Sequence, residues 1–163
     1  MLKLVRCDDR LIHGQCMTYI VNDYAIRNII VIDDFTATNQ IIKAIFTAAI
    51  PKTLSASVLT LAGSKEVIEN ALKDDSNSLL LMKKPQTYLQ LREMITSLPD
   101  SLNIGPQTIR NGCKICTPYA ALNQEEANAC KTLANQGVRV YFNSIGSSSK
   151  FVEWASVEKL FNT

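Results

Sequence analysis

Short apolar runs alternate with helically spaced apolar residues from Leu2 to Leu98. The runs have strand length and cover residues 2–6, 28–33, 53–61 and 78–82. After each run, apolar residues recur three or four positions apart, which predicts a helix with one apolar face. These stripes are Cys16, Met17, Ile20, Val21 and Tyr24; Ile41, Ile42, Ile45, Phe46 and Ala49, closed by Pro51; Val67, Ile68, Ala71 and Leu72; and Leu91, Met94, Ile95 and Leu98.

The alternation breaks after residue 100. Residues 101–105 and 113–122 are two strand-like runs joined by a turn-rich segment too short for a crossover helix, so we expect them to pair antiparallel or to sit at one edge of the sheet. A helix over 123–135 stops at Gly137, a last strand covers 138–143, and a final helix covers 147–161.

Repeated strand–helix–strand units predict an α/β fold with three layers, in which helices cover both faces of a mainly parallel central sheet of about seven strands. We expect residues 1–163 to form a single domain. In such sheets, ligands bind where loops leave the carboxyl ends of the strands.

Composition narrows the function classes. The formal charge is +2 and no basic run is present, so we do not expect a nucleic-acid partner. No apolar stretch approaches the ~20 residues that cross a bilayer, and charges fall within the first ten residues, which predicts a cytoplasmic protein. Five cysteines argue against a disulfide framework, and we interpret the Cys113–Cys116 pair as small core or edge residues.

The chemistry-bearing residues gather at the predicted carboxyl edge. His13 is the sole histidine and lies where the first strand gives way to a helix, whose free amides favour an anion. Arg10 is suited to contact phosphate oxygens, Asp8 or Asp9 to hold one imidazole nitrogen, and Gly14 to permit close approach. If the first strand is central, His13 faces four charged residues across a shallow cleft: Asp33, Asp34, Lys83 and Lys84.

Ordinary structural explanations compete with each of these assignments. The Asp-Asp-Arg run suits a salt-bridge cluster at a helix start, a lone histidine is often packed or solvated, and residues 33–39 are typical of a helix cap. A hydrolase that uses His13 as a general base would need a second histidine or a metal cluster, and a nucleotide-binding module would need a glycine fingerprint. The sequence has no other histidine and no such fingerprint.

The stretch RCDDRLIHGQC, residues 6–16, closely resembles the N-terminal signature of phosphotransferase system (PTS) IIB proteins of the mannose-fructose-sorbose family. Arg6 and the run from Asp8 to Gln15 match, whereas Cys16 replaces a valine. Residues 28–34 and 79–86 resemble later family segments. In residues 102–115, five positions fit the family pattern and Pro106 and Gln107 do not; the five are Asn103, Gly105, Arg110, Gly112 and Lys114.

The resemblance implies a cytoplasmic phosphocarrier with phosphotransferase activity, peripherally associated with a membrane permease and without cofactor or metal. His13 would accept a phosphoryl group on Nδ1 from a phosphorylated IIA protein and pass it to a sugar through the membrane components IIC and IID. The sugar stays open among mannose, fructose, sorbose and an N-acetylated amino sugar such as N-acetylgalactosamine. The alternative is a regulatory or sugar-sensing paralogue with reduced transfer.

The resemblance also implies roles for single residues. Arg10 would steady the phosphoryl group and Asp9 would orient the imidazole. Further positions would support the phosphate site, namely Arg6, Asp8, Gly14 and Gln15. Lys83 and Lys84 depart from the family, which usually has an asparagine in this loop, and because of their positive charge we expect them, with Asp34, to face partners.

Overall fold

The computed structural model describes residues 1–145 and 150–162, except for the side chains of Gln15 and Cys16. Its centre is a seven-stranded sheet in the order β3-β2-β4-β1-β5-β8-β9, in which β9 alone is antiparallel to its neighbour. The strands are β1 (Leu2–Cys7), β2 (Asn28–Ile32), β3 (Ser55–Leu59), β4 (Ser78–Met82), β5 (Ser101–Ile104), β8 (Arg139–Phe142) and β9 (Val152–Glu153). The predicted mainly parallel sheet is confirmed.

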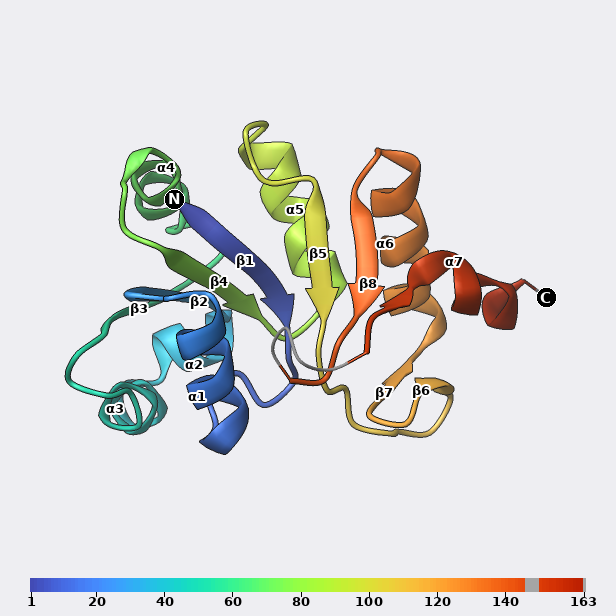
Figure 1. The fold of residues 1–163 in the computed structure, drawn as a ribbon, viewed down its shortest axis with the longest axis horizontal. Coiled ribbons are helices and arrows are strands. Elements are labelled where there is room, and N and C mark those ends of the chain that lie inside the picture. Colours follow the sequence, from blue (N-terminus) through green and yellow to red (C-terminus); the bar gives the residue numbers. More distant parts are fainter. Residues whose placement is uncertain (146–149, 163) are drawn as a thin grey trace.

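Helices cover both faces of this sheet (Figure 1). One face packs against α1 (Gly14–Asp23), α2 (Asp34–Thr38) and α3 (Gln40–Ala48). The other packs against α4 (Lys65–Lys73), α5 (Pro85–Met94), α6 (Gln124–Asn135), α7 (Trp154–Val157) and a 3₁₀ helix (Glu158–Phe161). Two apolar clusters, one on each side of the sheet, form the core, so the α/β three-layer prediction is confirmed.

The second half of the chain departs from the sequence prediction in three places. Residues 113–122 are not one strand, because they fold back as β6 (Lys114–Thr117) and β7 (Ala120–Leu122) in a separate antiparallel hairpin. As a result β5 lies inside the parallel sheet between β1 and β8. The predicted final helix over 147–161 begins with β9 and is helical only from Trp154, while residues 146–149 lie outside the described part.

Two helix boundaries also differ. The helix after Pro85 ends at Met94, so Leu98 packs into the core from the following loop. Residues 33–39 contain an additional short helix, α2, which Asp33 caps by accepting a hydrogen bond from the Thr36 amide at 3.1 Å. The cap interpretation of this segment is therefore confirmed for Asp33.

Strand order decides which loops meet. β1 lies at the middle of the sheet and leads into α1 on one face, whereas its neighbours β4 and β5 lead towards helices on the other face. Such a reversal opens a crevice outside the carboxyl ends of the strands. Figure 1 shows the ends of β1, β5 and β8 converging at this edge.

A buried arginine ties these ends together. The Arg6 side chain is 1% exposed, and its guanidinium donates to Asn103 Oδ1 on β5, to the Asn143 carbonyl at 3.0 Å and to the Ser144 carbonyl at 2.8 Å. It also pairs with Asp8 at 3.4 Å. Gly105 gives the guanidinium room, because a Cβ at this position would lie 2.3 Å from Arg6 Nη2.

We expect Gly105→Ala to lower the free energy of unfolding by about 3 kcal/mol, because the added methyl group displaces a buried, fully engaged charge. Urea unfolding measures the change. The matched control is Gly63→Ala, whose Cβ would meet only the Thr60 hydroxyl at 3.0 Å; we expect it to change stability by less than about 1 kcal/mol. Equal effects from the two substitutions would contradict the close-approach role of Gly105.

Candidate functional site

His13 stands at the start of α1 as its N-cap residue. Its backbone is extended, with φ −156° and ψ 143°, and its own side chain makes no capping hydrogen bond. Leu11 with φ 56° and Gly14 with φ 46° adopt left-handed backbone on either side of it. Gly14 suits this conformation because it has no Cβ. The loop therefore turns sharply around His13 and leaves the positive end of α1 uncapped.

The imidazole of His13 is half-buried. Its Nδ1 atom is covered and has no hydrogen-bond partner among the described residues. A buried polar nitrogen without a partner is uncommon and calls for an explanation. Reaction through Nδ1 requires the ring to turn, and no hydrogen bond at this nitrogen opposes that rotation.

Asp8 and Asp9 bond to other groups instead of the imidazole. Asp8 accepts from the Arg10 amide at 3.1 Å and from Arg6, and Asp9 accepts from the Thr108 amide at 2.6 Å. The hydrogen bonds of the described residues join neither carboxylate to His13, so this geometry does not fill the orienting role expected for Asp9. Both carboxylates hold the loop that carries His13.

Burial dominates the electrostatics of Asp8. It raises the pKa of the carboxyl above its usual value, although Arg6, the Arg10 amide and His13 act in the opposite direction. The Arg6–Asp8 pair is thus a buried, hydrogen-bonded ion pair, whose worth lies in fixing geometry more than in net attraction.

Arg10 is the free cation beside His13. Its side chain is exposed and makes no hydrogen bond or ion pair with the described residues. Gln15 lies in the first turn of α1, and its side chain lies outside the described part of the structure. The structure thus places His13 at the helix start next to Gly14, with the exposed Arg10 three residues before it.

The four charged residues predicted to face His13 line a different cavity. Asp33, Asp34, Lys83 and Lys84 surround a hollow of about 280 Å³ with the exposed ring of Phe35, whereas His13 borders another hollow. The predicted shared cleft is therefore wrong. The four residues follow β2 and β4, whereas the hollow beside His13 lies between α1 and the loop after α3.

Three of these four residues make structural contacts. Lys83 pairs with Asp33 at 3.2 Å, and Asp34 accepts from the Leu61 amide at 2.7 Å. Burial acts to raise the pKa of Asp33, but hydrogen bonds from Thr36 and the Lys83 ammonium outweigh it and hold that pKa below its usual value. Lys84 is exposed at the N-cap of α5.

The segment 106–110 supports the His13 loop, and its role was not recognised from the sequence. The Pro106 carbonyl accepts from the Asp9 amide at 3.2 Å, and Gln107 reaches the Lys83 carbonyl at 3.2 Å. Arg110 pairs with both oxygens of Glu126 at 2.9 Å, and Glu126 closes the capping box of α6. In the sequence, the Asn-x-x-Glu spacing at residues 123–126 is typical of a capping box, and it was the pattern that could have indicated Glu126, the buried partner of Arg110.

The cysteines carry no disulfide in the described structure, where four are free: Cys7, Cys113, Cys116 and Cys130. Burial raises the pKa of Cys116 to about 11 and that of Cys130 further, which disfavours the reactive thiolate. Within residues 1–145 and 150–162, no three His, Cys, Asp or Glu side chains are grouped so as to hold a metal ion.

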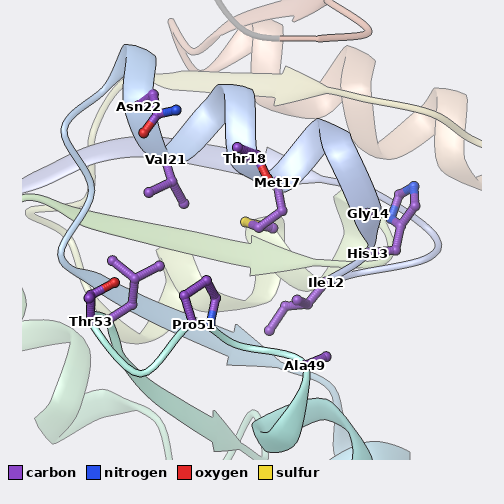
Figure 2. Close-up of a pocket in the computed structure, with 11 residues that line it drawn as sticks. Ile12, His13, Gly14, Met17, Thr18, Val21, Asn22, Ala49, Pro51 and Thr53 are labelled. Atoms are coloured by element: carbon purple, nitrogen blue, oxygen red, sulfur yellow. The ribbon is translucent and has the colours of Figure 1, made fainter.

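A groove opens beside His13 (Figure 2). It runs between α1 and the loop after α3 and has a volume of about 240 Å³. His13 and Gly14 lie at one end, and Asn22 and Thr53 lie at the other.

In the part of the chain that the structure describes, none of the helices is long and apolar enough to cross a membrane.

Comparisons with known proteins place the chain in a family. The family model described as PTS system sorbose subfamily IIB component matches residues 2–161. The fructose-specific EIIB component of Bacillus subtilis is 25% identical over 152 residues, which cover 92% of this chain and 93% of that protein. The mannose-specific EIIAB component of Escherichia coli is 25% identical over 160 residues, and the chain spans only 49% of that longer protein.

A solved structure agrees with the sequence matches. The IIBSor domain of the sorbose permease from Klebsiella pneumoniae superposes with a TM-score of 0.87 at 25% identity, covering 100% of this chain and 98% of that domain. The fold, the signature around His13 and the family match point to one assignment. The chain belongs to the sorbose subfamily of phosphotransferase system IIB components, which serve sugar transport.

Proposed function

We propose that His13 is the phosphoryl carrier of this IIB component. The observation that carries the proposal is the position of the sole histidine at the uncapped start of α1, on the central strand's loop. A lone pair of the imidazole attacks phosphorus, a new N–P bond forms, and the N–P bond to the donor's histidine breaks. The donor ring leaves with the bonding electrons and gains a proton, while His13 loses the proton on its other nitrogen.

The surroundings of His13 suit this transfer. Phosphoryl transfer needs charge neutralisation and alignment more than covalent help. The free guanidinium of Arg10 and the positive end of α1 supply charge, and Gly14 leaves room at the reacting atom. Asp8, Asp9 and Arg6 support the site indirectly, since they fix the loop through Arg10, Thr108 and the neighbouring strands.

The donor that we propose is a phosphorylated IIA protein, and the acceptor is a sugar reached through the membrane components IIC and IID. The mannose-specific EIIAB relative supports the donor, because its name places IIA and IIB functions in one protein. We place the protein in the cytoplasm, at the inner surface of its permease. Mannose, fructose, sorbose and N-acetylgalactosamine are the candidate sugars.

A second hollow, lined by Asp34, Lys83 and Lys84, lies at the same edge of the sheet. We propose that this region contacts partners. Lys84 is its free cation, because Asp33 already engages Lys83, and an exposed charge mainly speeds encounter with an oppositely charged partner.

Incubation with a phosphorylated IIA protein is expected to place one acid-labile phosphate on the wild-type chain and none on His13→Ala. Mass spectrometry of the intact protein measures the label, and circular dichroism checks that the variant folds. Label on His13→Ala would exclude His13 as the carrier. An unlabelled wild-type chain, tested with IIA proteins of the mannose, fructose and sorbose systems, would favour the regulatory paralogue.

Arg10→Gln is expected to slow phosphoryl transfer to His13 about 100-fold, because it removes the free cation next to the reacting group. Rapid-quench measurement of the labelling rate tests this, with Arg27→Gln as a control at the opposite edge of the sheet. Arg10→Lys keeps the charge but not the bidentate geometry, so we expect an intermediate rate. Wild-type rates in both Arg10 variants would remove Arg10 from the site.

Lys84→Gln is expected to lower the association rate with IIA about threefold at low salt and to lose this effect at high salt. Stopped-flow binding at two ionic strengths measures it. Lys131→Gln, on the exposed face of α6, is the matched control. An unchanged, salt-independent rate for Lys84→Gln would show that this hollow does not face IIA.

A further inference from the structure

The groove beside His13 has an apolar lining. Its walls include Ile12, Met17 and Val21 from the α1 side and Ala49, Pro51 and Leu54 from the loop after α3. The hollow of about 240 Å³ has room for one leucine- or phenylalanine-sized side chain. Such a pocket within a protein surface is where an interface places an anchoring residue.

The helices around this groove expose apolar residues and carry few charges. α1 and α3 contain one charged residue each, Asp23 and Lys43, whereas α4 contains four in nine positions. α3 has no buried residue, and its Ile41 and Ile45 are 75% and 63% exposed. Tyr19 on α1 is 50% exposed. This apolar surface continues from the groove across α3.

The charged residues that adjoin the groove's lining in the sequence are mostly positive. Arg10 and Lys52 are exposed and lie within two residues of the lining residues Ile12 and Pro51, whereas Asp23 follows Asn22 at the end of α1. A partner that brings a phosphoryl group is negatively charged at the point of contact, whereas the sugar acceptor is neutral. Charge complementarity therefore favours the phosphorylated donor as the protein that covers this face.

Position gives the same answer. His13 borders the groove, so a protein that aligns a phosphohistidine with His13 comes to lie next to the groove. We propose that the groove between α1 and the loop after α3 takes an apolar side chain of the IIA donor as an anchor, with the exposed face of α3 completing the contact. This inference rests on the proposed phosphocarrier function and names how the donor is held.

Filling the groove tests the proposal. Thr18 is exposed on α1 and lines the groove, so Thr18→Trp occupies the space without disturbing the core. The matched control is Thr132→Trp, an exposed position on α6 on the other side of the sheet. Ala49→Phe fills the groove from its other wall and guards against a local effect of one variant.

The measurement is calorimetric binding of the unphosphorylated IIA protein that labels the wild-type chain. We expect both filling variants to bind it about 30-fold more weakly, which corresponds to losing one buried apolar anchor, and Thr132→Trp to bind as the wild type does. Thermal unfolding confirms that each variant is folded. Wild-type affinity in both filling variants would overturn the proposal.

Two further results separate this proposal from the phosphocarrier function. A labelled His13→Ala would refute the carrier role without touching the groove, because the groove is tested by the affinity of the two filling variants and not by the label. In membrane vesicles that contain IIC and IID, pre-phosphorylated Thr18→Trp should still pass its phosphate to sugar at the wild-type rate. Loss of this second transfer alone would assign the groove to the membrane components and overturn the IIA assignment.

Discussion

The buried guanidinium of Arg6 is the interaction on which the rest of this edge depends. A charge that is 1% exposed is tolerable only when every donor has a partner, and here the partners are Asn103, Asp8 and the carbonyls of Asn143 and Ser144. These groups come from β1, β5 and the segment after β8. One side chain therefore fixes the relative positions of three strand ends, and Gly105 is small because the guanidinium lies against it.

The strand ends that Arg6 joins form a rigid base. The loop that carries His13 is attached to this base and is itself less constrained. Asp8, which pairs with Arg6, also accepts a hydrogen bond from the Arg10 amide and so ties the loop to the buried guanidinium. Asp9 accepts a hydrogen bond from the Thr108 amide and ties the same loop to the segment after β5. Beyond these anchors the Arg10 side chain and the imidazole are not held by hydrogen bonds to the described residues. An anchored backbone with unanchored side chains suits the proposed phosphoryl transfer, because a carrier must present its nucleophile to two partners in turn while its backbone stays fixed.

Two of the departures from the family pattern, Pro106 and Gln107, lie in the segment that supports the His13 loop. Pro106 and Gln107 bond to Asp9 and Lys83 and meet the β6–β7 hairpin, so they shape the loop that holds the His13 segment from behind. Substitutions there adjust how the site is supported and leave His13 and Arg10 in place. The surface proposed for the donor, over α1 and α3, lies on the opposite face of the sheet from α6.

The sequence by itself determined most elements of the first half, the α/β class and the position of His13 between the first strand and the first helix, because apolar periodicity and a contiguous signature are local properties of the chain. The places of Arg10 and Gly14 follow for the same reason, since they lie within three residues of His13. Only the tertiary structure decided the partners of Asp8 and Asp9, the separation of Lys83 and Asp33 from His13, and the folding of residues 113–122 into a hairpin. Those features depend on contacts between segments as distant as Arg6 and Ser144, and on strand order, neither of which local spacing encodes.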